Sequence, residues 1–208
     1  LNTVAAVETL NLVSGTAANT VTLNAAAVLG KVAATATNDL TLVGTSGQFD
    51  TKEVTSTGAG KLTVQLNSIA TADVSKVAAS TLVLNAGASG ASIVTANSAS
   101  TIRLGTDVTS GGATTLDSKT AAGTQATTVT VQVANDQTAN SLTLAPALNS
   151  ATISSTKAVT LNALTTNAAN VTVNGSNDVT ISTLTNTAND VINATNLTGK
   201  LTITNALA

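Results

Sequence analysis

The chain has 208 residues, a formal charge of −2 at pH 7 and 43% hydrophobic residues, enough apolar material for one sizeable domain or two small ones. Phe49 is the one aromatic residue, and Trp, Tyr, Met, Cys and His are absent, which excludes disulfides and thiolate metal sites. A single Arg among 9% charged residues excludes the clustered basic surface that binds nucleic acid or anionic membranes.

A tripeptide with the pattern apolar, Thr, apolar recurs along the chain. Its outer two residues point to one face of a strand and its Thr to the other, which is typical of a half-buried strand. From Val21 to Leu201 the series takes nine steps of about twenty residues each. Leu82-Val83-Leu84 and Ile102-Arg103-Leu104 fill two steps with another central residue. The complete copies are Val21-Thr22-Leu23, Leu40-Thr41-Leu42, Leu62-Thr63-Val64, Leu142-Thr143-Leu144, Val159-Thr160-Leu161, Val179-Thr180-Ile181 and Leu201-Thr202-Ile203.

A second apolar position precedes most of the tripeptides and predicts a second strand in each repeat. Corners such as Thr37-Asn38-Asp39 and Gly58-Ala59-Gly60 separate the strands, and their residues favour tight turns. A fixed period indicates a repeat architecture. We therefore predict an all-β fold, a parallel β-solenoid with about 20 residues per coil and nine to ten coils; tandem β-sandwich domains are the alternative. The second positions are Val32, Val54, Val74, Ile93, Val171 and Val191.

The rhythm breaks between Leu104 and Thr128. The next strand starts at Val129, and its distance along the chain from Ile102 is longer than one repeat. The distance from Val129 to Leu142 is shorter than one repeat. Together the two distances equal two repeats. We predict a single solenoid over residues 1–208 with a loop insertion near 105–128. A linker near residue 110 or 125 is the alternative. Because no signal peptide precedes the alternating pattern, we expect a segment of a longer protein.

Few residues suggest chemistry. Without His, Cys or Tyr, we expect no enzyme activity. The Asn-Asp step recurs four times, and its oxygens suit calcium, which is the only cofactor that the sequence suggests. Asn-Asp is also a good turn, the favoured interpretation, and the Gly-Gly-x-Gly-x-Asp calcium repeat is missing. The candidate calcium ligands are Asp39, Asp136, Asp178 and Asp190.

Two surface patterns remain. The outward Thr residues suggest an ice-binding ladder, but Val83 and Arg103 interrupt the series and the next outward positions are mixed, so ice binding is a remote alternative. Four Asn-x-Ser/Thr sequons are present, and such matches are expected by chance in a chain this rich in Thr and Asn. They begin at Asn170, Asn174, Asn193 and Asn196.

In composition and cadence the chain resembles the surface-layer proteins that Gram-negative bacteria export by the type I route. Strings such as Asn-Asp-Leu-Thr-Leu (38–42), Lys-Ala-Val-Thr-Leu-Asn-Ala (157–163) and Asn-Asp-Val-Thr-Ile-Ser (177–182) carry the resemblance. It implies a β-solenoid on the outside of the bacterial cell that assembles with copies of itself into a lattice, with calcium at lattice contacts.

The expected function is therefore structural, a rigid tile in an extracellular array. Other domains would supply any contact with cell-surface polysaccharide. The alternative is a stalk or passenger module of a large bacterial adhesin, which would display loops such as 104–128. We expect neither nucleic-acid binding nor membrane insertion, since no run approaches the roughly 20 apolar residues of a spanning helix.

Overall fold

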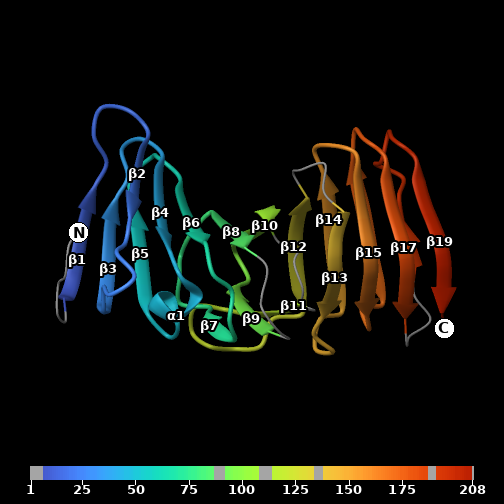
Figure 1. The fold of residues 1–208 in the computed structure, drawn as a ribbon, viewed down its shortest axis with the longest axis horizontal. Coiled ribbons are helices and arrows are strands. Elements are labelled where there is room, and N and C mark those ends of the chain that lie inside the picture. The colour runs from blue at the N-terminus through green and yellow to red at the C-terminus, as the bar shows by residue number, and fades with distance from the viewer. Residues whose placement is uncertain (1–6, 87–91, 108–113, 134–137, 187–190, 208) are drawn as a thin grey trace.

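The computed structural model describes residues 7–86, 92–107, 114–133, 138–186 and 191–207. Its strands stack along the long axis of a rod, with the N-terminus at one end and the C-terminus at the other (Figure 1). The named strands in these residues all pair in parallel with strands of neighbouring coils. The protein is a parallel β-solenoid, as the repeat predicts, and the antiparallel pairing of tandem β-sandwiches is not observed between the described strands.

In the described part of the chain three sheets build the solenoid, and each coil contributes one even-numbered and one odd-numbered strand. Sheet A contains β1 (Val7–Val13), β3 (Leu29–Thr35) and β5 (Glu53–Thr57). Sheet B contains β2 (Asn19–Thr22), β4 (Leu40–Gly44), β6 (Leu62–Leu66), β8 (Thr81–Ala86), β10 (Thr101–Asp107), β12 (Thr128–Val133), β14 (Ser150–Ser155), β16 (Asn170–Gly175) and β18 (Val191–Asn193). Sheet C contains β7 (Ala72–Val74), β9 (Ser92–Asn97), β11 (Thr114–Lys119), β13 (Thr138–Leu144), β15 (Val159–Thr166), β17 (Val179–Asn186) and β19 (Leu201–Leu207).

The coils are slightly longer than the sequence period suggests. Thr20 of β2 and Asn193 of β18 stand at the same register position, eight coils apart along sheet B. The mean is about 22 residues per turn over about eight turns. The difference arises because the corners vary in length: the step from Val64 to its partner Leu82 is shorter than the mean, and that from Ile102 to its partner Val131 is longer.

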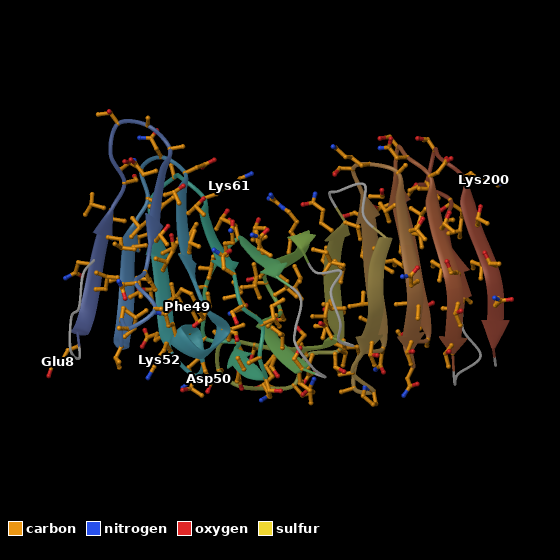
Figure 2. The ribbon with its side chains drawn as sticks, viewed as in Figure 1. Glu8, Phe49, Asp50, Lys52, Lys61 and Lys200 are labelled. Atoms are coloured by element: carbon orange, nitrogen blue, oxygen red, sulfur yellow. The ribbon has the colours of Figure 1, made fainter. Side chains whose placement is uncertain are left out.

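A short helix, α1 (Ser46–Phe49), lies between β4 of sheet B and β5 of sheet A. Thr45 and Gln48 form a capping box at its N-terminus, which satisfies backbone N–H groups that a helix start leaves free. The helix contacts β7 of the next coil, and the Thr51 N–H after it donates to the Asp73 carbonyl at 2.7 Å. Phe49, labelled in Figure 2, is fully buried and fills this wider corner.

The core is one continuous cluster of Ala, Val, Leu and Ile with Phe49, running from Leu12 to Leu184. Most of those on strands occupy alternate positions, so that apolar side chains stack from one coil to the next, as Leu42 does on Val64, while others, such as Leu148, lie at corners. The middle of the rod differs, because seven buried polar residues of the described ranges fall between residues 75 and 118. They are Ser75, Ser92, Thr95, Asn97, Ser100, Thr114 and Ser118.

Ser118 in this polar stretch offers a stability test. Its hydroxyl is buried and has no hydrogen-bond partner among the described residues, whereas the buried Ser100 hydroxyl donates to the Ala79 carbonyl at 2.6 Å. We expect Ser118→Ala to stabilise the fold by about 1 kcal/mol and Ser100→Ala to destabilise it by about 1 kcal/mol. Denaturant unfolding of both variants measures this, and equal shifts of the same sign would contradict it.

The tripeptide series does not belong to one sheet. The copies up to Leu62-Thr63-Val64 lie on sheet B, and those from Leu142 onward lie on sheet C. The interpretation of the interval from Ile102 to Leu142 as two whole repeats was therefore wrong, because the two residues stand on different faces. Among the second apolar positions, Ile93 and Val191 are 48% and 59% exposed, so they point outward rather than into the core.

The stretch near 105–128 is partly strand. β10 continues to Asp107, β11 pairs with β9 and β13, and residues 120–127 form a loop in which Gln125 makes an isolated antiparallel bridge to Lys119. Sheet B also pairs across this stretch, through β10 and β12. The described parts of both sheets therefore continue from one side of the break to the other.

Candidate functional site on the outer faces of the solenoid

The most regular surface feature is a column of eight threonines on the outer face of sheet B. One Thr from each strand from β2 to β16 stands at the same register position, and Asn193 of β18 takes the ninth. Each Thr precedes an apolar residue that lies in or against the core, and none is fully buried. At roughly 4.8 Å between strands, the eight threonines span roughly 34 Å. They are Thr20, Thr41, Thr63, Thr81, Thr101, Thr130, Thr152 and Thr172.

The tripeptide pattern concealed this column. Thr63 pairs with Thr81 rather than with Val83, and Thr41 pairs with Thr20 rather than with Thr22. The expected interruptions, Val83 and Arg103, stand in a neighbouring column, so the expectation of an interrupted Thr ladder was wrong. The signal that would have revealed the column is the dipeptide of Thr followed by an apolar residue, as in Thr81-Leu82 and Thr101-Ile102.

The neighbouring outward column is mixed. It includes Val43 and Val83, which are each only 6% exposed although they lie outside the core cluster, and Arg103, whose Nε is buried without a partner among the described residues. Its members in order are Thr22, Val43, Gln65, Val83, Arg103, Gln132, Ser154 and Asn174. The regular part of the face is therefore one residue wide.

Sheet B carries almost no charge. Arg103 and Asp107 are the charged residues within its described strands. Figure 2 shows Lys61 and Lys200 along one rim of the rod and Asp50 and Lys52 along the opposite rim, near the ends of strands. A sheet face with so little charge can pack against another surface while removing few ions from water, a removal that costs free energy.

The candidate calcium ligands that the structure describes act as turn acceptors. Asp39 Oδ1 accepts from the Lys61 N–H at 2.9 Å, and Asp178 Oδ1 accepts from the Lys200 N–H at 2.8 Å, one coil on in each case. Asp39 precedes a strand of sheet B and Asp178 a strand of sheet C, so the structure does not bring them together. Asp136 and Asp190 lie outside the described residues. Within the described ranges, no three His, Cys, Asp or Glu side chains form a group that could hold a metal ion.

A second polar cluster, on sheet C, has no local signal in the sequence. Lys119 Nζ lies over the Thr95 position and contacts Asp73 Oδ2 at 3.0 Å, two coils away, and Gln125 Nε2 donates to Asp117 Oδ1 at 2.7 Å.

Two opposing effects act on the pKa of Asp73. Partial burial raises it, but hydrogen bonds from Ser75 and from Lys119 lower it by more, so the pKa of Asp73 is lowered. The hydrogen bond and charge of Asp73 raise the pKa of Lys119.

The ion pair predicts a pH dependence of stability. Because the folded-state pKa of Asp73 is lowered, its contribution is complete above its unfolded pKa of about 3.9 and is lost as the pH falls through the lower folded value. The raised pKa of Lys119 makes its contribution complete below about pH 10.4 and lost as the pH rises through the raised value. Melting temperatures from pH 2 to 7 should decline less toward acid in Asp73→Asn than in the wild type. Parallel curves would contradict the assignment.

Comparisons with known proteins do not identify this chain. No protein-family model, curated protein or solved structure matches it. No helix in the described ranges is long and apolar enough to cross a bilayer.

Proposed function

We propose that the chain is a rigid structural unit of an extracellular, self-assembling surface-layer protein on a bacterial cell, with no catalytic role. The observation that carries this proposal is the outer face of sheet B, a regular strip of parallel strands along the rod with two charged residues in its described strands. The resemblance in composition and cadence to Gram-negative surface-layer proteins supports the same assignment.

The charge balance favours association between copies. A formal charge of −2 on 208 residues gives little electrostatic repulsion between molecules. The Thr column offers hydroxyl groups for hydrogen bonds and methyl groups for close packing, at a constant spacing set by the strands. A neighbouring molecule can meet the same pattern at each coil, which suits a lattice.

Electron microscopy of the purified protein tests assembly. We expect sheets or two-dimensional crystals from the wild type, with calcium and chelator arms showing whether the metal takes part. The double variant Thr101→Lys/Thr130→Lys places two like charges on the Thr column and should prevent assembly. Thr35→Lys, at an exposed position of sheet A, is the matched control and should still assemble. Wild-type monomers at high concentration, with and without calcium, would contradict the proposal and favour an adhesin module.

Ice binding is a second candidate, because the Thr column is uninterrupted over eight strands. Hydroxyl and methyl groups repeated at a fixed spacing can hold water molecules in an ordered row. The wild type and the same two variants test it through the shape of ice crystals grown in their presence. Faceted crystals with the wild type and Thr35→Lys, but round discs with the double variant, would support ice binding; round discs in all three samples would exclude it.

A further inference from the structure

The four sequons of the chain gather on the last coils of sheet B. Asn170 and Asn174 lie on β16 and Asn193 on β18, while Asn196 follows in the next turn. Thr172, which completes the sequon of Asn170, pairs with Asn193 on the neighbouring strand. Asn170, Asn193 and Asn196 are exposed, and Asn174 is half-buried. The folded chain therefore presents its sequons on one surface.

Asn193 differs from the other three in its local geometry. Its Oδ1 accepts a hydrogen bond from the Thr195 N–H at 3.0 Å and another from the Thr195 hydroxyl at 2.7 Å. These bonds form an Asx turn, and they join the two essential residues of the sequon Asn193-Ala194-Thr195. Both bonds are made by the amide oxygen, so the amide nitrogen takes no part in them. Both residues are exposed.

The other sequons are arranged differently. Asn170 and Thr172 lie two positions apart on a regular strand, where about 6.6 Å separates successive side chains on one face. The Ser176 hydroxyl, which ends the second sequon, accepts from the side-chain amide of the next residue at 3.1 Å. The Thr198 hydroxyl, which ends the fourth, donates to a backbone carbonyl of the preceding coil at 3.4 Å. In the described residues, therefore, the hydroxyl-to-amide contact distinguishes Asn193.

We propose that Asn193 is an N-glycosylation site. Its Nδ2 would form a bond to C1 of the first sugar of an oligosaccharide carried on a polyprenyl diphosphate. The bond from C1 to the diphosphate oxygen breaks, the polyprenyl diphosphate leaves, and the amide proton passes to a base of the oligosaccharyltransferase. The Thr195 hydroxyl, bonded to the amide oxygen, stabilises the negative charge that grows there as the nitrogen loses its proton.

The position gives the modification a structural consequence. Asn193 takes the ninth place of the Thr column, so a glycan there would cover the end of that column and leave the threonines of the first coils open. The site requires export from the cytosol and in this respect rests on the proposed extracellular function. Its chemistry can be measured on the purified chain, separately from assembly.

The test uses folded protein, a purified oligosaccharyltransferase that accepts Asn-x-Ser/Thr and its polyprenyl-linked donor, followed by peptide mass spectrometry. We expect fragmentation of the modified peptide to place a glycan on Asn193, with none at that site in Asn193→Gln or Thr195→Ala and partial modification in Thr195→Ser, which keeps the hydroxyl. Equal melting temperatures of the variants and the wild type would show that the fold is intact.

Two results would overturn the proposal. One is modification at Asn170, Asn174 or Asn196 with Asn193 left bare. The other is no mass gain on the protein while a short sequon peptide in the same reaction is glycosylated. Because assembly is assayed on unmodified protein, a failure here leaves the array proposal standing, and a failure to assemble leaves this acceptor test valid.

Discussion

Leu142→Asp is expected to unfold the coils around β13. Leu142 is 3% exposed and stands in register with Thr114 of β11 and Leu164 of β15. An unpaired carboxylate in this core costs about 3 to 5 kcal/mol, a large fraction of the ~5 to 15 kcal/mol that stabilises a typical domain. Because each coil is stabilised by its neighbours, the loss should spread to adjacent coils. Circular dichroism during thermal unfolding measures it.

Thr143→Asp is the matched control for that variant. Thr143 is the next residue of β13, points outward and pairs with Thr115 and Thr165. A carboxylate there remains in water, so the expected loss is at most about 1 kcal/mol. If both variants melted at the wild-type temperature, the assignment of Leu142 to the core would be wrong.

Gly58→Ala should also destabilise the fold strongly. Gly58 has a φ of +100°, a conformation that L side chains rarely adopt, and a Cβ there would lie 2.3 Å from the Ala36 carbonyl oxygen in the preceding coil. That oxygen accepts the Gly60 N–H at 2.7 Å, so moving it aside would break a bond between stacked corners. Backbone strain and the lost bond together should cost about 2 to 4 kcal/mol, measurable by urea unfolding.

Gly47→Ala separates this effect from glycine replacement in general. Gly47 lies in α1, and a Cβ there would meet nothing within 4 Å. Alanine is the better helix former, so this variant should be as stable as the wild type or up to about 1 kcal/mol more stable. A comparable loss in both variants would show that the close stacking of corners at Gly58 is not the cause.

The fold could be predicted from the sequence because inward apolar residues return once per coil wherever the strands lie. The identity of the face could not be predicted, since a tripeptide such as Leu142-Thr143-Leu144 suits sheet C as well as sheet B. The alternation of inward and outward residues also does not reveal a shift of two residues in the pairing register of a strand, because such a shift keeps every side chain on its own face. Such a shift relative to the tripeptide series places Thr81, and not Val83, beside Thr63.

The contacts of the candidate surface residues could not be predicted from the sequence either, because they join residues of different coils. Asp39 and Asp178 were recognisable as corner residues, but their acceptor role depends on the Lys N–H one coil later, which the sequence does not place beside them. The contact between Lys119 and Asp73 crosses two coils, so no local pattern indicates it. The outward position of Ile93 was missed because a one-residue change of phase within a short strand exchanges it with the buried residue that follows.

Because the Thr column keeps a constant register, the solenoid can gain whole coils during evolution without disturbing the spacing of its threonines. Duplication of one whole coil would add about 4.8 Å to the column and leave all the existing threonines in register, because the strands of a coil pair only with strands of the adjacent coils. A gain or loss of one residue within a strand would instead turn threonines inward and apolar residues outward. Corners are free to vary, as the short step from Val64 to Leu82 and the long step from Ile102 to Val131 show. Changes in length should therefore accumulate at corners, while the strands of sheet B keep their spacing.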